Sequence, residues 1–259
     1  MSRRAVEMFT RRQRWADEPE PYWKQRSWQL SAGFLAVVLV LGGIVALTSG
    51  GETGTDRARA AAAGPLSGDA APRDGRPQGC ATDDSAGDAL PKAPPDDVSW
   101  DTLGITRVPV SASAGPTRTT GTLRWCFART PIGAVLAAHV IPSQMSGSGW
   151  RTVTEQQVVA GAGRDMFEFQ RSTVQDIDSG EQTGDAAVAT YAGFTVTSYK
   201  STAASVKLLL RTSQGYAATT IVLRWSGGDW KVLPNGDGSL HTPVTAVQGN
   251  TSGYTLWGD

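Results

Sequence analysis

The longest apolar stretch of the chain is WQLSAGFLAVVLVLGGIVAL, residues 28–47, and it carries no charged side chain. As a helix rising about 1.5 Å per residue, this stretch spans roughly 30 Å, the thickness of the hydrocarbon core of a bilayer. The pattern therefore predicts a single transmembrane helix. A cleaved signal peptide is the alternative, because small residues follow at 58–64, but the apolar run is longer than the ~7–15 residues of such a peptide.

Two later segments have helical periodicity, and the first is TPIGAVLAAHVIPSQM, residues 130–145. Thr130 is a capping residue, Pro131 fits the first helical position, and Pro142 ends or kinks the predicted helix. Four apolar residues recur on one predicted face: Ile132, Val135, Leu136 and Val140.

The second helical segment begins at TVTE, residues 152–155, which has the spacing of a capping box, and is predicted to continue through residue 172. The predicted buried stripe of this helix consists of Val158, Val159, Ala162, Met166 and Phe169. The GAG at 161–163 has no strand before it and no third glycine at the required offset. It therefore indicates close helix packing and not a dinucleotide-binding loop.

The pattern then changes to strands, predicted over residues 192–200, 205–212 and 216–225, and to a hairpin that turns at Gly227-Gly228. In this register Trp225 faces Trp230 and Leu223 faces Val232, on one apolar side with Ile221. The other side of the hairpin, with Arg224, Asp229 and Lys231, is expected to face solvent or a partner. Trp257 is expected to dock on the domain.

The order of these elements predicts an α+β fold, in which helices pack against a curved antiparallel sheet. We assign this extracytoplasmic domain to residues 99–259. Residues 48–98 are rich in Gly, Ala, Pro and Asp and predict a flexible linker, because such a segment buries too little apolar surface to offset its ordering entropy. The part of the linker from Cys80 onward is expected to be held to the domain.

Charge gives the expected orientation in the membrane. Seven basic and four acidic side chains lie in residues 1–27, and few basic residues directly follow the apolar span. This asymmetry predicts a cytoplasmic N-terminal tail on a single-pass protein of the cell membrane. Over the whole chain, 24 basic residues balance 24 acidic ones, so we expect no nucleic-acid partner. Membrane lipids are the expected partners of residues 28–47.

The candidate chemistry is sparse. His139 lies within an apolar stretch and is expected to be a core histidine, and His241 has no acidic or cysteine neighbour at catalytic spacing. Asp165 and Glu168 lie three residues apart beside arginines and predict a solvated charged face. No metal, phosphate or nucleophile motif is present. We therefore predict no catalytic, cofactor-binding or metal-binding residues, no cofactor, and no enzymatic activity.

The two cysteines, Cys80 and Cys126, both follow the apolar span. If the predicted orientation is correct, they face an oxidising compartment, where such a pair commonly forms a disulfide. That disulfide closes a loop of about 45 residues and contributes roughly 4 kcal/mol in a chain-entropy treatment. Two buried free thiols are the alternative.

Three segments carry a resemblance to a known group of proteins: CFARTPIGAVLAA at 126–138, GP at 115–116 and VLRWSGGDWKVLP at 222–234. Over residues 80–235 the chain resembles a family of poorly characterised actinobacterial single-pass membrane proteins associated with conjugative elements. Its layout and the order of helices and sheet are similar to the nuclear-transport-factor-2-like cone domain of the type IV secretion inner-membrane assembly component.

The resemblance implies a non-enzymatic scaffold or assembly factor of a conjugation or type IV secretion-like apparatus, whose partners are other membrane or secretion-apparatus proteins. The alternative is a membrane-anchored small-ligand-binding or enzymatic cone, for which Tyr191, Tyr199 and Asp185 are candidates by residue type. A homo-oligomer is a further option, because Ala32 and Ala36, or Gly42 and Ala46, have a small-xxx-small spacing.

Overall fold

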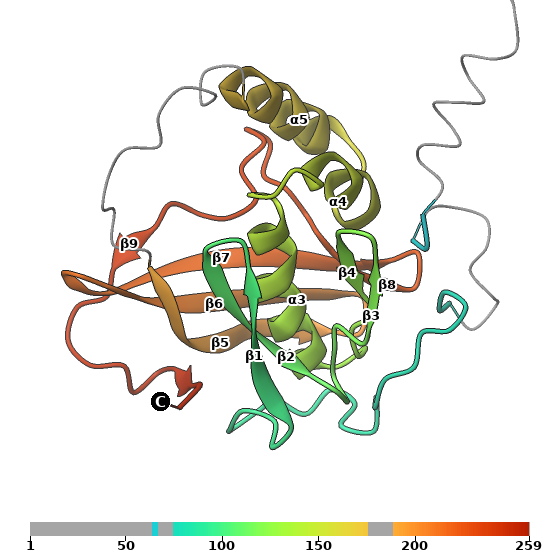
Figure 1. Ribbon diagram of the computed structural model, residues 1–259. Helices are drawn as coiled ribbons and strands as arrows, with labels where there is room; N and C mark the ends of the chain where they lie inside the picture. The colour runs from blue at the N-terminus through green and yellow to red at the C-terminus, as the bar shows by residue number, and fades with distance from the viewer. Residues whose placement is uncertain (1–63, 67–74, 176–188, 259) are drawn as a thin grey trace, which may run out of the picture. The chain divides into compact units, whose positions relative to one another are not determined.

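The computed structural model describes residues 64–66, 75–175 and 189–258 (Figure 1). The predicted transmembrane helix over 28–47, the tail before it and Asp185 lie outside these ranges. Within the described residues, no helix combines the length and the hydropathy that crossing a bilayer requires. This part of the chain has an α+β fold built mainly from antiparallel strands.

The main sheet has six strands, in the order β10-β5-β6-β7-β8, with β9 also paired to β7. Their bounds are β5 Thr190–Lys200, β6 Ala203–Thr212, β7 Gly215–Ser226, β8 Asp229–Val232, β9 Thr245–Ala246 and β10 Thr255–Leu256. The three predicted strands and the hairpin are confirmed. Trp225 lies opposite Trp230, and Leu223 lies opposite Val232.

Two smaller hairpins precede the helices and were not predicted. One consists of β1 (Val98–Leu103) and β2 (Thr106–Ser111), and the other of β3 (Arg118–Thr120) and β4 (Leu123–Trp125). Val98 and Trp100 alternate with polar residues along β1, but this period-2 pattern is too short to be distinctive in a sequence.

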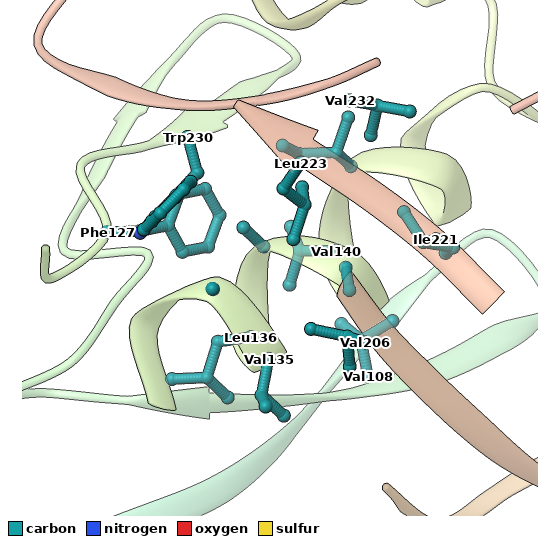
Figure 2. Close-up of a cluster of buried hydrophobic side chains, with 14 of the residues drawn as sticks. Val108, Phe127, Val135, Leu136, Val140, Val206, Ile221, Leu223, Trp230 and Val232 are labelled. Carbon is teal, nitrogen blue, oxygen red and sulfur yellow. The ribbon is translucent and has the colours of Figure 1, made fainter. Parts of the chain in front are cut away.

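Helix α3 (Pro131–Gln144) lies between the β1–β2 hairpin and the main sheet (Figure 1). Its predicted start is confirmed, because the Thr130 hydroxyl accepts a hydrogen bond from the Gly133 N–H at 3.2 Å and Pro131 follows the cap. The prediction of a single apolar face was wrong. Most of the helix is buried all round, since strands cover it on two sides. Figure 2 shows Val135, Leu136 and Val140 of α3 among apolar side chains of β2 and the sheet.

The predicted second helix is two helices, α4 (Trp150–Gln157) and α5 (Ala162–Gln175). The helix breaks because Val158 adopts an extended conformation and forms a parallel bridge to Val232, and the Val159 N–H donates to the Val232 carbonyl at 2.9 Å. The predicted capping box was also wrong, since α4 starts at Trp150, before Thr152.

The predicted buried stripe was wrong for α5. Val158 is buried, but Ala162 is exposed, as are Met166 at 42% and Phe169 at 69% of their surface. None of the described side chains of α5 is buried. Phe167 of this helix contacts α4, since its ring meets the Trp150 ring edge-on at 6.1 Å, and Arg171 lies over the same Trp150 ring at 6.0 Å.

A set of contacts that we term the hairpin clasp joins Asp229 and Trp230 of β8 to Cys126, Phe127 and Ala128. The Asp229 carboxylate accepts hydrogen bonds from the backbone N–H groups of Cys126 at 2.7 Å and Phe127 at 3.0 Å. It also accepts one from the Trp230 N–H at 2.9 Å, and the Trp230 indole donates to the Ala128 carbonyl at 2.9 Å. The prediction that Asp229 faces solvent was wrong: the residue is fully buried.

The hairpin clasp requires glycine at two places where backbones meet. A β-carbon on Gly115 would lie 2.6 Å from the Cys126 carbonyl oxygen, and one on Gly133 would lie 2.0 Å from the Ala128 carbonyl oxygen. No larger residue fits these positions without a shift of the main chain. The segments at 115–116, 126–138 and 222–234 therefore meet at one point of the fold.

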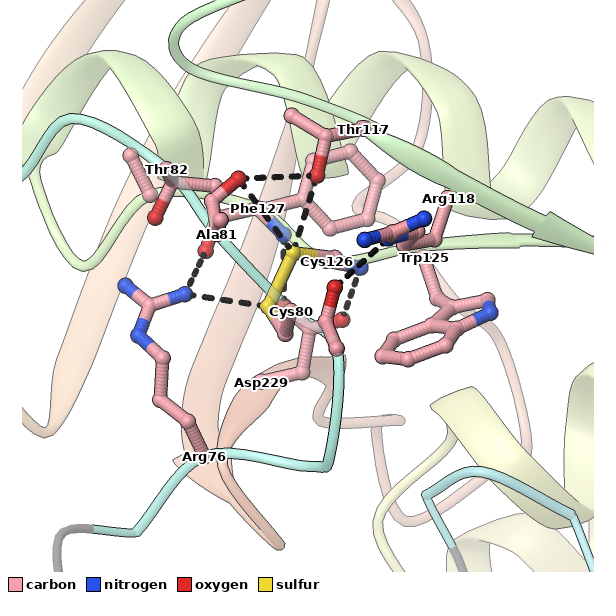
Figure 3. Close-up of a disulfide and its surroundings, with 12 residues drawn as sticks. Arg76, Cys80, Ala81, Thr82, Thr117, Arg118, Trp125, Cys126, Phe127 and Asp229 are labelled. Atoms are coloured by element: carbon pink, nitrogen blue, oxygen red, sulfur yellow. Dashed lines mark hydrogen bonds between the residues drawn. A yellow bond between two sulfur atoms is a disulfide. The ribbon is translucent and has the colours of Figure 1, made fainter.

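The predicted disulfide is confirmed (Figure 3). Cys80 and Cys126 are bonded, with their Cα atoms 5.4 Å apart. Beside them, Arg76 donates to the Phe127 carbonyl at 3.1 Å and pairs with Asp84. The Lys231 ammonium donates to the Leu66 carbonyl at 3.2 Å, and the Leu66 side chain is buried. The chain before β1 is thus attached to the same end of the domain as the hairpin clasp.

We predict that Asp229→Ala lowers the free energy of unfolding by at least about 2 kcal/mol at pH 7, because it leaves buried backbone N–H groups without an acceptor. Burial raises the pKa of Asp229 from 3.8 to about 6, outweighing its hydrogen bonds from the backbone. Between these two pH values the folded protein holds a proton that the unfolded chain has released, so the contribution of Asp229 to the free energy of unfolding rises as the pH falls.

The difference in the free energy of unfolding between wild type and Asp229→Ala should therefore grow as the pH is lowered from 7 to 4, as measured by denaturant titration. Asp96→Ala, at an exposed carboxylate, is the matched control and should change stability little. Equal stability of the Asp229→Ala variant and wild type would show that the hairpin clasp does not hold the domain together.

Candidate functional site

His139 on α3 is fully buried, which confirms the expectation of a core histidine. Its Nδ1–H donates to the Val135 carbonyl oxygen at 2.7 Å, and Nε2 then accepts from the Trp257 indole at 3.2 Å. Both ring nitrogens are satisfied in the neutral form. Burial lowers the pKa of His139 from 6.5 to about 4, so the ring stays neutral at physiological pH.

An aromatic cluster surrounds His139. Tyr191 of β5 meets the imidazole edge-on at 4.6 Å, and its hydroxyl lies 3.0 Å from the Ser143 hydroxyl of α3. Burial raises the pKa of Tyr191. Trp257 packs against Phe194 at 4.6 Å and against Trp100 of β1 at 6.2 Å, so its expected docking on the domain is confirmed. The cluster ties β1, α3, β5 and the segment around β10 together.

A cavity of about 420 Å³ lies against this cluster. The β1–β2 hairpin forms one wall, and residues from the ends of β5, β6 and β7 form another. The lining residues are Trp100, Arg107, Thr190, Tyr191, Ala192, Arg211, Tyr216, Leu256 and Gly258. Because Tyr191 and Trp100 also belong to the aromatic cluster, the buried side of the cavity is fixed by packing.

Within the described residues, the lining carries two positive charges and no carboxylate. The Arg107 guanidinium lies over the Trp100 ring at 5.5 Å, and the Arg211 guanidinium lies over the Tyr216 ring at 5.8 Å. Neither arginine forms an ion pair within the described residues. The arrangement presents guanidinium N–H donors next to flat aromatic surface, which suits an anion with an apolar body.

Three residues were named for an enzymatic or ligand-binding cone, and of the two that the structure describes, Tyr191 lines the cavity and Tyr199 does not. The Tyr199 hydroxyl donates to the Arg129 carbonyl at 2.9 Å instead, and burial raises the pKa of Tyr199 to about 12. Asp185 lies outside the described residues. His241 is exposed, and its Nδ1 lies 2.8 Å from the Thr242 carbonyl oxygen.

The carboxylates on α5 belong to a solvated charged face, as expected. Asp165 is exposed, and Glu168 lies 3.7 Å from the Arg164 guanidinium. Burial raises the pKa of Glu168, and Arg164 opposes that shift. Met166 and Phe169, which we term the α5 apolar pair, lie on the same helix and are both exposed. Among the residues whose positions are described, no three His, Cys, Asp or Glu side chains gather as metal ligands would.

Sequence reasoning missed Trp100, Arg107, Arg211 and Tyr216 as site residues. The first two lie on strands that were not predicted, and the last two flank the short turn between β6 and β7. Each is an ordinary strand residue in the sequence. What brings them together is the docking of the β1–β2 hairpin near the end of the sheet, and no local pattern encodes that docking.

Comparison with known proteins gives one match. A family described as "Domain of unknown function (DUF8175)" matches residues 61–256, which is more than half of the chain. The match begins ahead of the disulfide and ends at the last residue of β10. No curated protein and no solved structure matches the chain.

We predict that the stability of the wild-type protein contains a contribution from His139 that is present above pH 6.5 and lost as the pH falls toward 4. The unfolded chain protonates this histidine near pH 6.5, whereas the folded protein resists protonation to about pH 4. The difference corresponds to about 3 kcal/mol.

The measurement is denaturant unfolding of wild type and His139→Gln at several pH values. The stability advantage of wild type over the variant should shrink by about 3 kcal/mol between pH 7 and pH 4, because only wild type carries the buried imidazole. His241→Gln makes the same substitution at an exposed site and should follow wild type. A constant difference between wild type and His139→Gln would contradict this account.

Proposed function

The chain belongs to the DUF8175 family, and we propose that it acts as a non-enzymatic scaffold or assembly factor of a conjugation or type IV secretion-like apparatus. In this proposal residues 28–47 anchor a single-pass protein in the cell membrane, residues 1–27 lie in the cytoplasm, and the DUF8175 domain lies outside it. The apolar span and the basic residues before it support this arrangement.

The disulfide supports the extracytoplasmic placement of the domain. Disulfides persist in oxidising compartments and are rare in the cytosol. The Cys80–Cys126 bond also fastens the chain that leads from the apolar span to the domain core. Such an attachment suits a domain that transmits force or position between a membrane anchor and its partners.

The α5 apolar pair is the observation that carries the scaffold role. A helix normally buries its apolar face, and here Phe169 has 69% and Met166 has 42% of its surface exposed, with charged residues beside them. Exposed aromatic and methionine side chains framed by polar residues are typical of protein–protein contact surfaces. We propose that another protein of the apparatus covers this face of α5.

The likeness to a nuclear-transport-factor-2-like cone is part of the same proposal. The supporting feature is the packing of α3 against an antiparallel sheet. The alternative of a ligand-binding cone has an observation of its own, the cavity between the β1–β2 hairpin and the sheet. Its described lining combines two tyrosines with two arginines, a set that supports the binding of an anion.

We predict that Phe169→Glu lowers DNA transfer by about tenfold or more, in a conjugating host that encodes this protein, because a charge replaces an apolar contact at the centre of the interface. Transfer frequency is measured by mating, and protein abundance by immunoblot.

Ile105→Glu is the matched control, because Ile105 is 78% exposed but lies in the turn between β1 and β2. A host that carries the Ile105→Glu variant should transfer DNA at the wild-type frequency. Normal transfer by Phe169→Glu at normal abundance would remove the assigned role of α5, and normal transfer in a gene deletion would remove the proposed function.

A further inference from the structure

We propose that the cavity lined by Arg107, Arg211, Trp100, Tyr191 and Tyr216 is a binding site for a small organic acid with a flat, apolar body, such as an aromatic carboxylate. This site lies on different elements from the α5 apolar pair. The inference does not depend on the scaffold role.

The charge of the cavity selects an anion. Arg107 on β2 and Arg211 on β6 both line the cavity, and no other lining residue among those that the structure describes is charged. Both arginines are exposed, and neither has an acidic partner within the described ranges 64–66, 75–175 and 189–258. Guanidinium groups bind carboxylates through two parallel N–H···O hydrogen bonds, a geometry that lysine does not provide.

The aromatic residues select a flat apolar body. Trp100 lies next to Arg107, and Tyr216 lies next to Arg211, so each positive charge of the cavity has an aromatic ring beside it. Tyr191 and Leu256 add further apolar surface to the lining. A planar ring between such walls gains stacking and buried area in addition to its ionic contacts.

The rigidity and size of the cavity suit a small molecule. Tyr191 is fixed by its hydroxyl contact with Ser143 at 3.0 Å, and Trp100 is fixed by Trp257, which His139 holds in turn at 3.2 Å. Because these side chains are already ordered in the free protein, they lose little conformational entropy when a ligand binds. The volume of about 420 Å³ is within the range of small-ligand sites, roughly 300–1,000 Å³.

The test is isothermal titration of the purified full-length protein with 2-naphthoate, with the neutral 2-naphthamide and with sodium acetate. We expect 2-naphthoate to bind at one site, and both other compounds to bind about tenfold more weakly or not at all. The amide lacks the charge and acetate lacks the ring. Equal binding of the amide would overturn the role of the arginines, and equal binding of acetate would overturn the role of the aromatic walls.

Variants locate the binding site. Arg107→Gln and Arg211→Gln should each lower the affinity for 2-naphthoate by about tenfold or more, with unchanged circular dichroism and thermal midpoint. Arg224→Gln, which removes an exposed arginine of β7 outside the lining, should leave the affinity unchanged. Absence of 2-naphthoate binding to wild type, or equal loss in all three variants, would overturn the proposal.

Discussion

The buried carboxylate of Asp229 is the contact on which the rest of the domain depends. It binds the backbone of Cys126 and Phe127, which lie 103 and 102 residues earlier in the sequence. This contact positions Cys126 for the disulfide and Ala128 for the indole of Trp230, directly before the N-terminus of α3. It also places β8 where Val232 can pair with Val158 and so separate α4 from α5. The Asp229 side chain therefore links three parts of the domain: the chain before β1, the helix α3 and the strand β8 at the edge of the sheet.

Local patterns predicted the elements that depend on local causes. The structure confirms the cap at Thr130, the glycine turn between Trp225 and Trp230, and the strand alternation. Each of these features depends on residues that are only a few positions apart. The orientation of Asp229 could not be predicted in this way. Alternation assigns it to the solvent side, and two of the three backbone N–H groups that offset the cost of its burial lie more than 100 residues away.

The candidate sites show the same limit. The helical periodicity of α5 predicts a buried stripe. An apolar face does not indicate, however, whether the surface that covers it belongs to the same chain or to another protein. For the cavity, sequence reasoning found Tyr191 alone. Arg107 and Arg211 lie on strands far apart in the sequence, and they line one cavity because the β1–β2 hairpin and the main sheet both pack on α3. The chemistry of the site is thus a product of packing.

The position of the hairpin clasp along the chain restricts when the domain can fold. A chain that emerges from the ribosome, or from an export channel, presents Cys126 and Phe127 long before Asp229, and their N–H groups lack their native acceptor until β8 arrives. The central helix likewise lacks the strands that cover it until most of the sheet is present. The domain cannot be completed in step with its emergence, because contacts of such sequence separation form late. The domain therefore remains unfolded while the chain emerges, and it folds only after nearly all of its residues have emerged.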